Sequence, residues 1–251
     1  MRRWGLLGSS LSHSFSPGFF QAKFQAVGLK HADYELFERS NASAVRELFE
    51  QHPELEGLNV TVPHKTAVIP YLDELTPVAQ AIGAVNTIRR MPDGRLLGHN
   101  TDAEGFAGSL RPFLTGDHDR AMILGAGGAA SAVRHALQEL GIEVVHLVRN
   151  APPKDVSFRW VQWEDVEAAA VRHYRLIVQA TPVGTAPHVD ESVPFPWEGV
   201  GPRHLVVDLI YNPAETAFLK MAAHQGALTL NGGDMLTLQA EAAWKFWTSP
   251  T

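Results

Sequence analysis

The sequence predicts an α/β protein with mostly parallel strands, and three observations support this fold class. Short apolar runs alternate with helical patterns from one end of the chain to the other. A glycine-rich turn directly follows one apolar run, residues 121–124, and opens a helical pattern. The 251 residues are enough for one or two domains. Ligands are therefore expected at the carboxyl ends of the strands.

The first half of the chain repeats strand and helix. Ser16 is expected to cap a helix whose first residue is Pro17 and which ends at Gly28. The expected order is a strand at 4–7, this helix, a strand at 34–37, a helix at 44–50 and a strand at 58–62.

A hairpin is expected next, because Pro92-Asp93-Gly94 is a turn signal between the strands 84–89 and 95–97. A polar run, 98–102, then precedes a helix that starts near Glu104. The polar residues 115–119 break that helix and connect to a second unit.

The second unit opens with the strand 121–124 and its glycine-rich turn. A helix is expected to Leu140, with Gly141 at its end, followed by a strand at 142–148. Further strands are expected at 176–180, 205–209 and 227–230, and a final helix carries Leu236, Ala240, Ala243 and Trp244 on one face.

Composition excludes several classes of function. A formal net charge of −6 without a basic block gives no footprint for nucleic acid. The absence of Cys excludes disulfides, thiolate nucleophiles and cysteine zinc sites. Twelve His are scattered without metal-ligand spacing, so no metal is expected. No apolar run reaches the roughly 18 residues of a membrane span, and none forms a signal-peptide core, so a cytoplasmic location is expected.

The run 59–65, Asn-Val-Thr-Val-Pro-His-Lys, ends an apolar strand with polar side chains and an amine. Alternation places Asn59 and Thr61 on one side of the strand, while Val60 and Val62 anchor it in the core from the other side. Pro63 stops the strand, so Lys65 is expected near a helix start, where the partial positive charge lowers its proton affinity. A solvated lysine after an ordinary strand is the plainer interpretation.

The turn after residue 124 has the G-x-G-x-x-A form of a dinucleotide fingerprint in a strand–loop–helix context. Gly125 permits a tight turn, Gly127 lets the backbone approach a pyrophosphate, and Ala130 permits close packing of the helix. The next strand ends without an acidic residue and carries Arg149, with Lys154 a few residues on. This favours NADP over NAD, because a 2′-phosphate would be bound at this point.

Together these and further motifs resemble the shikimate dehydrogenase family, in the family's order and over essentially the whole chain. The residues that carry the resemblance are Ser14 and Ser16, the run 59–65, the run 83–87 (Gly-Ala-Val-Asn-Thr), Asn100-Thr101-Asp102, the glycine turn, Tyr211-Asn212-Pro213 and the run 232–236 with Gln239.

The resemblance implies reversible, NADPH-dependent reduction of 3-dehydroshikimate to shikimate in aromatic amino-acid biosynthesis. It implies a substrate domain, 1–103 plus 233–251, a Rossmann domain, 104–232, and an active site in the cleft between them. The implied catalytic pair is Lys65 and Asp102; the implied substrate ligands are Ser14, Ser16, Asn59, Thr61, Asn86, Tyr211 and Gln239; the implied cofactor ligands are Gly125, Ala126, Gly127, Gly128, Ala129, Arg149, Lys154, Thr181 and Gly232.

The sequence departs from the family at the NADP clamp, where Val148-Arg149-Asn150 stands in place of the frequent Asn-Arg-Thr. Two alternatives therefore stay open: a quinate/shikimate dehydrogenase or paralogue that uses NAD, and a non-catalytic nucleotide or metabolite sensor on the same fold. The partners expected are the small-molecule substrate and no nucleic acid or membrane, with the chain a monomer or a homodimer.

Overall fold

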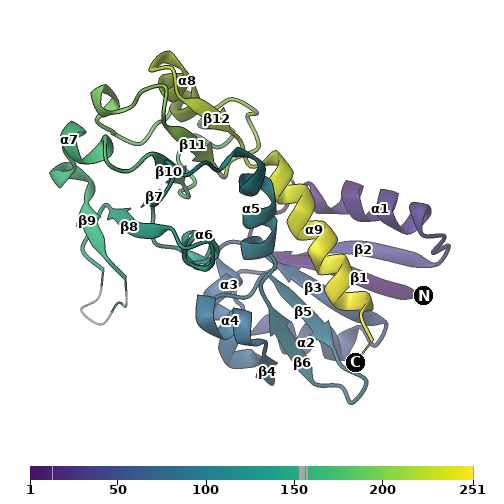
Figure 1. Cartoon of the computed structure of the whole chain (residues 1–251). Coiled ribbons are helices and arrows are strands. Elements are labelled where there is room, and N and C mark those ends of the chain that lie inside the picture. Colours follow the sequence, from purple (N-terminus) through teal and green to yellow (C-terminus); the bar gives the residue numbers. More distant parts are fainter. Residues whose placement is uncertain (13, 153–155, 157, 251) are drawn as a thin grey trace. The chain divides into compact units, whose positions relative to one another are not determined.

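A computed structural model describes residues 1–12, 14–152, 156 and 158–250 (Figure 1). The chain divides into two compact units, one formed by Met1–Thr101 with Gln239–Thr251 and the other by Asp102–Leu238. The sequence expectation of 1–103 with 233–251 drew the boundaries a few residues away from these. Which unit binds which ligand stays a prediction.

The first unit is built on a six-stranded mixed sheet with the order β2-β1-β3-β5-β6-β4. β1 is parallel to β2 and β3, whereas β5 is antiparallel to β3 and β6. The predicted hairpin is confirmed, with Gly94 at its turn (φ 88°). The strands are β1 (Arg2–Gly8), β2 (Ala32–Glu38), β3 (Leu55–Val60), β4 (Glu74–Leu75), β5 (Thr87–Arg90) and β6 (Leu96–His99).

Two cores cover the two faces of this sheet. One joins Leu7 and Leu58 to α2, and the other joins Trp4 and Leu6 to α1 and the C-terminal helix through Phe20, Phe24 and Trp247. The helices are α1 (Ser16–Ala26), α2 (Ala44–Gln51), α3 (His64–Ala67), η1 (Ile69–Tyr71), α4 (Pro77–Ile82) and α9 (Gly233–Thr248), whose residues from Gln239 onward belong to this unit.

The second unit is built on a six-stranded sheet whose strands are all parallel. Its order, β12-β11-β10-β7-β8-β9, reverses between β7 and β10 and is that of a doubly wound Rossmann sheet. The expected fold class is confirmed for both units. The strands are β7 (Arg120–Leu124), β8 (Glu143–Val148), β9 (Trp160–Gln162), β10 (Leu176–Gln179), β11 (Leu205–Asp208) and β12 (Leu228–Leu230).

The helices of the second unit cover its sheet. α7 and α8 bury Val171, Phe218 and Leu219 against the strands, while α6 buries Ala130 and Val133. Gly141 ends α6 with a left-handed backbone (φ 75°), as expected. The helices are α5 (Asp102–Leu110), η2 (Arg111–Phe113), α6 (Gly128–Glu139), η3 (Trp163–Asp165), α7 (Ala168–Val171), η4 (Trp197–Gly199) and α8 (Ala217–His224).

Two local predictions were wrong. Ser16 is the first residue of α1 and does not cap it; the backbone N–H of Ser16 instead donates to Ser14 Oγ at 3.3 Å. Val62 does not anchor the strand in the core, because β3 ends at Val60 and the Val62 side chain is 71% exposed. Leu58 and Val60 are buried as expected.

Among the described residues, no helix has both the length and the apolar composition that a membrane crossing requires.

Candidate active site

Lys65 lies on α3, one residue after its start, as the sequence predicts. Two contacts anchor this short helix. The buried His64 donates from Nε2 to the Arg39 carbonyl at 2.7 Å, and the Lys65 carbonyl accepts from the Val85 N–H at 2.7 Å. The Lys65 side chain is half-buried, and these two bonds hold its backbone in place five residues after the end of β3.

A buried network of amides and hydroxyls lies beside this end of β3. Asn86 Oδ1 accepts from the Thr101 N–H at 2.8 Å and from the Thr87 hydroxyl at 3.0 Å. Asn86 Nδ2 donates to Thr101 Oγ1 at 3.0 Å and to Gln239 Oε1 at 3.5 Å. Asn59 joins the network through Thr87, at 3.3 Å. The structure thus brings together Asn59, Asn86 and Gln239 from three separate parts of the sequence.

Ser14 and Ser16, two of the predicted substrate ligands, lie close together at the start of α1. The half-buried Ser14 accepts from the N–H of the buried Ser16. Ser14 thereby makes a local serine turn at the start of α1. Thr61, the remaining predicted ligand on this strand end, is half-buried and donates its N–H to the Leu7 carbonyl at 2.9 Å.

In the second unit, the glycine turn has the backbone that a dinucleotide needs. Gly125 has φ 111°, and a Cβ there would lie 3.1 Å from Thr181 Cγ2. A Cβ at Gly127 would meet no atom within 4 Å, which leaves room for a ligand to approach the backbone. The N-terminus of the twelve-residue α6 follows at once and favours anions. These features fit a pyrophosphate.

The buried His146 fixes this turn to β8. Its Nδ1 donates to the Gly125 carbonyl at 2.7 Å, while the Gly125 N–H donates to the Leu147 carbonyl at 2.9 Å. Burial lowers the pKa of His146, so the ring stays neutral and keeps this single tautomer. Sequence reasoning missed His146, although a lone polar residue inside a buried strand needs a partner.

Arg149 lies just after β8, and its guanidinium carbon is 5.6 Å from the centre of the Trp163 ring. This contact joins the candidate 2′-phosphate ligand to η3, which follows β9 in the chain. Lys154, the second basic residue expected here, lies outside the described residues.

Thr181 follows β10, next to β7 at the point where the strand order reverses. The buried Gln179 holds its turn: the side-chain oxygen accepts from the Thr181 N–H, and Nε2 donates to the Val183 carbonyl at 3.0 Å. Together with the approach of Thr181 to Gly125, this places a predicted cofactor residue beside the glycine turn.

A buried carboxyl holds the loop that carries Tyr211. Asp208 Oδ1 accepts from the Ile210 N–H at 3.0 Å, and Oδ2 accepts from the Thr216 hydroxyl at 2.7 Å. Thr216 in turn caps α8 by accepting from the Leu219 N–H. The Tyr211 side chain is 39% exposed between these fixed points.

Gly232 lies so close to Leu209, the residue after β11, that only glycine fits. A Cβ at this position would be 2.0 Å from the Leu209 carbonyl oxygen, and the Gly232 N–H donates to the Ile210 carbonyl at 3.0 Å.

Asp102 is buried at the start of α5, two residues before the expected helix start.

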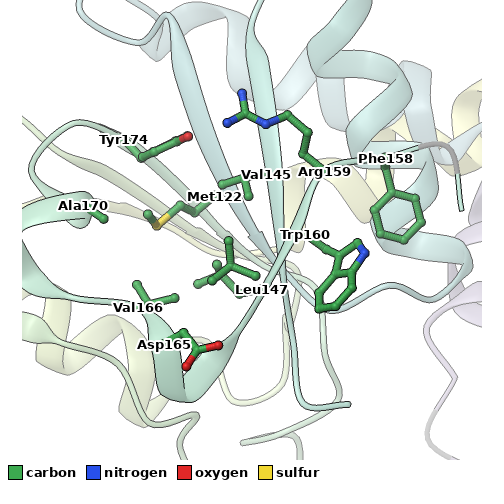
Figure 2. Close-up of a pocket in the computed structure, with 11 residues that line it drawn as sticks. Met122, Val145, Leu147, Phe158, Arg159, Trp160, Asp165, Val166, Ala170 and Tyr174 are labelled. Atoms are coloured by element: carbon green, nitrogen blue, oxygen red, sulfur yellow. The ribbon is translucent and has the colours of Figure 1, made fainter. Parts of the chain in front are cut away.

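A pocket of about 450 Å³ in the second unit contains none of the predicted residues (Figure 2). Figure 2 shows Trp160 and Phe158 on one side and Val166 and Ala170 on the other. Met122 lines the pocket from the middle of β7. Sheets of this kind bind ligands at the strand ends, so we do not assign the cofactor to this pocket.

No group of three His, Asp or Glu side chains in the described part of the chain could hold a metal ion. The predicted site residues of the two units carry amide, hydroxyl, ammonium and carboxylate groups. Such groups can bind a polyhydroxylated acid and move protons at its oxygens.

Comparison with known proteins gives a consistent result. A family model described as the shikimate dehydrogenase substrate binding domain matches residues 6–88. A shikimate dehydrogenase (NADP(+)) of Desulforamulus reducens is 38% identical, with 98% of this chain and 90% of the relative covered.

Two solved structures are similar over nearly the whole chain. Shikimate 5-dehydrogenase from Thermus thermophilus in complex with NADP(H) and shikimate is 35% identical, with a TM-score of 0.87 over 100% of this chain and 94% of that one. Quinate dehydrogenase from Corynebacterium glutamicum in complex with NAD is 29% identical, with a TM-score of 0.85 over 99% and 94%. This chain belongs to the shikimate dehydrogenase family.

Proposed function

We propose that this protein is an NADP-dependent shikimate dehydrogenase, which reversibly reduces 3-dehydroshikimate to shikimate in aromatic amino-acid biosynthesis. The observation that carries the proposal is the whole-length likeness to an enzyme of that name, over 98% of this chain. Apart from the neighbours of Arg149 at the NADP clamp, the polar residues of the family's motifs named above are present in the sequence. Intact Lys65 and Asp102 argue against a non-catalytic sensor.

The second unit would hold the cofactor. The turn from Gly125 to Ala129 and the start of α6 would bind the pyrophosphate, with Thr181 and Gly232 beside it. Arg149 would bind the 2′-phosphate, with Lys154 as a second basic group. The positive φ of Gly125 and the open space at Gly127 support this assignment.

When bound, NADPH supplies a hydride to the carbonyl carbon of the substrate. The carbonyl oxygen then gains negative charge, which the Lys65 ammonium stabilises while it donates a proton. Asp102 would act with Lys65 as the catalytic pair that the family's motifs imply and would accept from a neighbouring substrate hydroxyl. Ser14 and Ser16 bind the carboxylate, and Asn59, Thr61, Asn86, Tyr211 and Gln239 bind the ring hydroxyls and the carboxylate side.

Lys65→Ala tests the catalytic assignment. We expect turnover to fall by at least about 100-fold, the typical lower contribution of a positioned acid or base, while the KM for shikimate changes far less. Steady-state assays of shikimate oxidation, followed by nicotinamide absorbance, measure both quantities.

Lys30→Ala is the matched control, because it removes an exposed lysine from the same unit. Its turnover should equal that of the unaltered protein. Near-normal turnover of Lys65→Ala would exclude Lys65 from the proton transfer and would leave the family assignment without its proposed acid.

A cytoplasmic location and a monomeric or homodimeric state belong to the same proposal. The location is what the biosynthetic role favours, and both stay predictions.

A further inference from the structure

Tyr34 is a buried tyrosine of β2. Strand pairing fixes its backbone, and an aromatic contact fixes its ring. It pairs in register with Trp4 of β1, and its ring stacks on Phe20 of α1 with the centroids 4.6 Å apart and the planes at 10°. Its side chain is 5% exposed. The packing therefore fixes the position of the hydroxyl group.

That hydroxyl contacts a residue of the candidate substrate site. Tyr34 Oη lies 2.7 Å from Asn59 Oδ1, and this hydrogen bond is buried. The other end of the same amide lies 3.3 Å from both the Asn86 carbonyl oxygen and Thr87 Oγ1. Asn59 thus connects Tyr34 to the network around Asn86.

The donor and acceptor in each of these bonds follow from the contact with the Asn86 carbonyl. The Asn86 carbonyl oxygen can only accept, so the Asn59 atom that faces it is Nδ2. Oδ1 must then face Tyr34, and Tyr34 must donate. The opposite amide orientation would set two oxygens against each other without a proton between them.

Tyr34 is a donor suited to this task. Burial raises the pKa of its hydroxyl, so the proton stays in place through the neutral and alkaline range. The Ser16 side chain, at the start of α1, opposes part of that rise.

We propose that Tyr34 is a positioning residue of the substrate site, which together with the Asn86 carbonyl fixes the orientation of the Asn59 amide and thereby the atoms that Asn59 presents to the substrate. This inference rests on the proposed function, because it takes Asn59 as a substrate ligand.

Tyr34→Phe tests the inference, since it removes one oxygen and keeps the ring that stacks on Phe20. We expect the KM for shikimate to rise by about 3- to 10-fold, the equivalent of one net hydrogen bond. The turnover and the KM for NADP should stay within about twofold, because the nucleotide residues lie elsewhere in the sequence. Tyr71→Phe is the matched control: it removes the same oxygen from a half-buried tyrosine of η1 in the same unit, and should leave all three constants unchanged.

A double-mutant cycle with Asn59→Ala separates positioning from general stability. If Tyr34 acts through Asn59, the double variant will have the shikimate KM of Asn59→Ala alone. Thermal unfolding of each variant reports stability, and the KM for NADP reports that the protein is folded.

Three results would overturn the inference. A Tyr34→Phe protein that melts lower with an unchanged shikimate KM would assign Tyr34 a purely structural role, and so would additive effects in the cycle. If Asn59→Ala itself leaves the shikimate KM unchanged, then the proposed substrate site is wrong at Asn59, and the role of Tyr34 falls with it.

Discussion

Asp208 illustrates at the residue scale how a buried charge links the fold to the site. The carboxyl is fully buried, and burial raises its pKa to about 6, although hydrogen bonds from Thr216 and the Ile210 N–H oppose the rise. A raised pKa means that the folded protein binds this proton more tightly than the unfolded chain does. The stability contribution is therefore complete below about pH 4 and is lost as the pH rises through about 6.

Asp208→Asn should remove this pH dependence, because the amide resembles the protonated acid at every pH. We expect the free energy of unfolding of the variant, minus that of the unaltered protein, to increase from pH 4.5 to pH 7.5 by at most about 3 kcal/mol. Urea unfolding at a series of pH values measures the difference.

The control for this experiment is Asp119→Asn, which changes an exposed carboxyl of the same unit. Its difference from the unaltered protein should not vary in this pH range by a comparable amount. If the difference in free energy of unfolding between Asp208→Asn and the unaltered protein is also constant across this pH range, the raised pKa of Asp208 is contradicted.

The sequence identifies the candidate ligands but not the residues that hold them. Asn59 is visible as a polar residue in an apolar run, and a buried amide always needs partners. Nothing in the sequence shows that the partner is Tyr34, because Tyr34 fits a core strand position equally well. The partnership depends on the pairing of β1 with β2 and β3, which is set by tertiary structure.

At the element scale, the proposed cofactor preference depends on Arg149, which lies just after β8. The family's usual neighbours of the clamp arginine are absent, and Arg149 instead lies over Trp163. A cation over an indole ring is attracted by about 0.5–1 kcal/mol at an exposed site. Trp163 therefore restrains the guanidinium of Arg149, the proposed 2′-phosphate ligand.

Trp163→Leu should lower the preference for NADP by about 2- to 5-fold, measured as the ratio of kcat/KM with NADP to that with NAD. The constants with NAD should change little, because Arg149 has no phosphate to bind there. Trp197→Leu, from the same hydrophobic cluster, is the control for lost packing. A ratio that falls in Arg149→Ala but not in Trp163→Leu would exclude the role of Trp163.

Elements with a strong periodic pattern are predictable, and short ones at the sheet edges are not. The strand, glycine turn and helix at 120–139 combine an apolar run, Gly125 and a helical period, and the structure has all three. The edge strands β4 and β9 and the single-turn α7 have two to four residues each, too few for any period to show. They form because a neighbouring strand or face is available.

At the scale of the whole molecule, the topology of each sheet accounts for where the motifs fall. The second sheet reverses its order between β7 and β10, and both the glycine turn and Thr181 follow those two strands. In the first sheet, Asn59 and Thr87 face each other across β3 and β5. The order of motifs along the chain therefore predicts a group of ligand-binding residues at strand ends in each of the two sheets. The side-chain partners within each group depend on the strand register of the folded protein.

The central claim is the reaction itself, and the most direct measurement crosses two substrates with two cofactors. Purified protein is mixed with shikimate or quinate and with NADP or NAD, and reduced nicotinamide is followed by absorbance, with Lys65→Ala alongside. The account predicts turnover with shikimate and NADP that is far above the other three mixtures and lost in the variant. Turnover led by quinate or NAD would contradict the proposed specificity, and no turnover in any mixture, with NADPH still bound, would contradict the enzyme and favour a sensor.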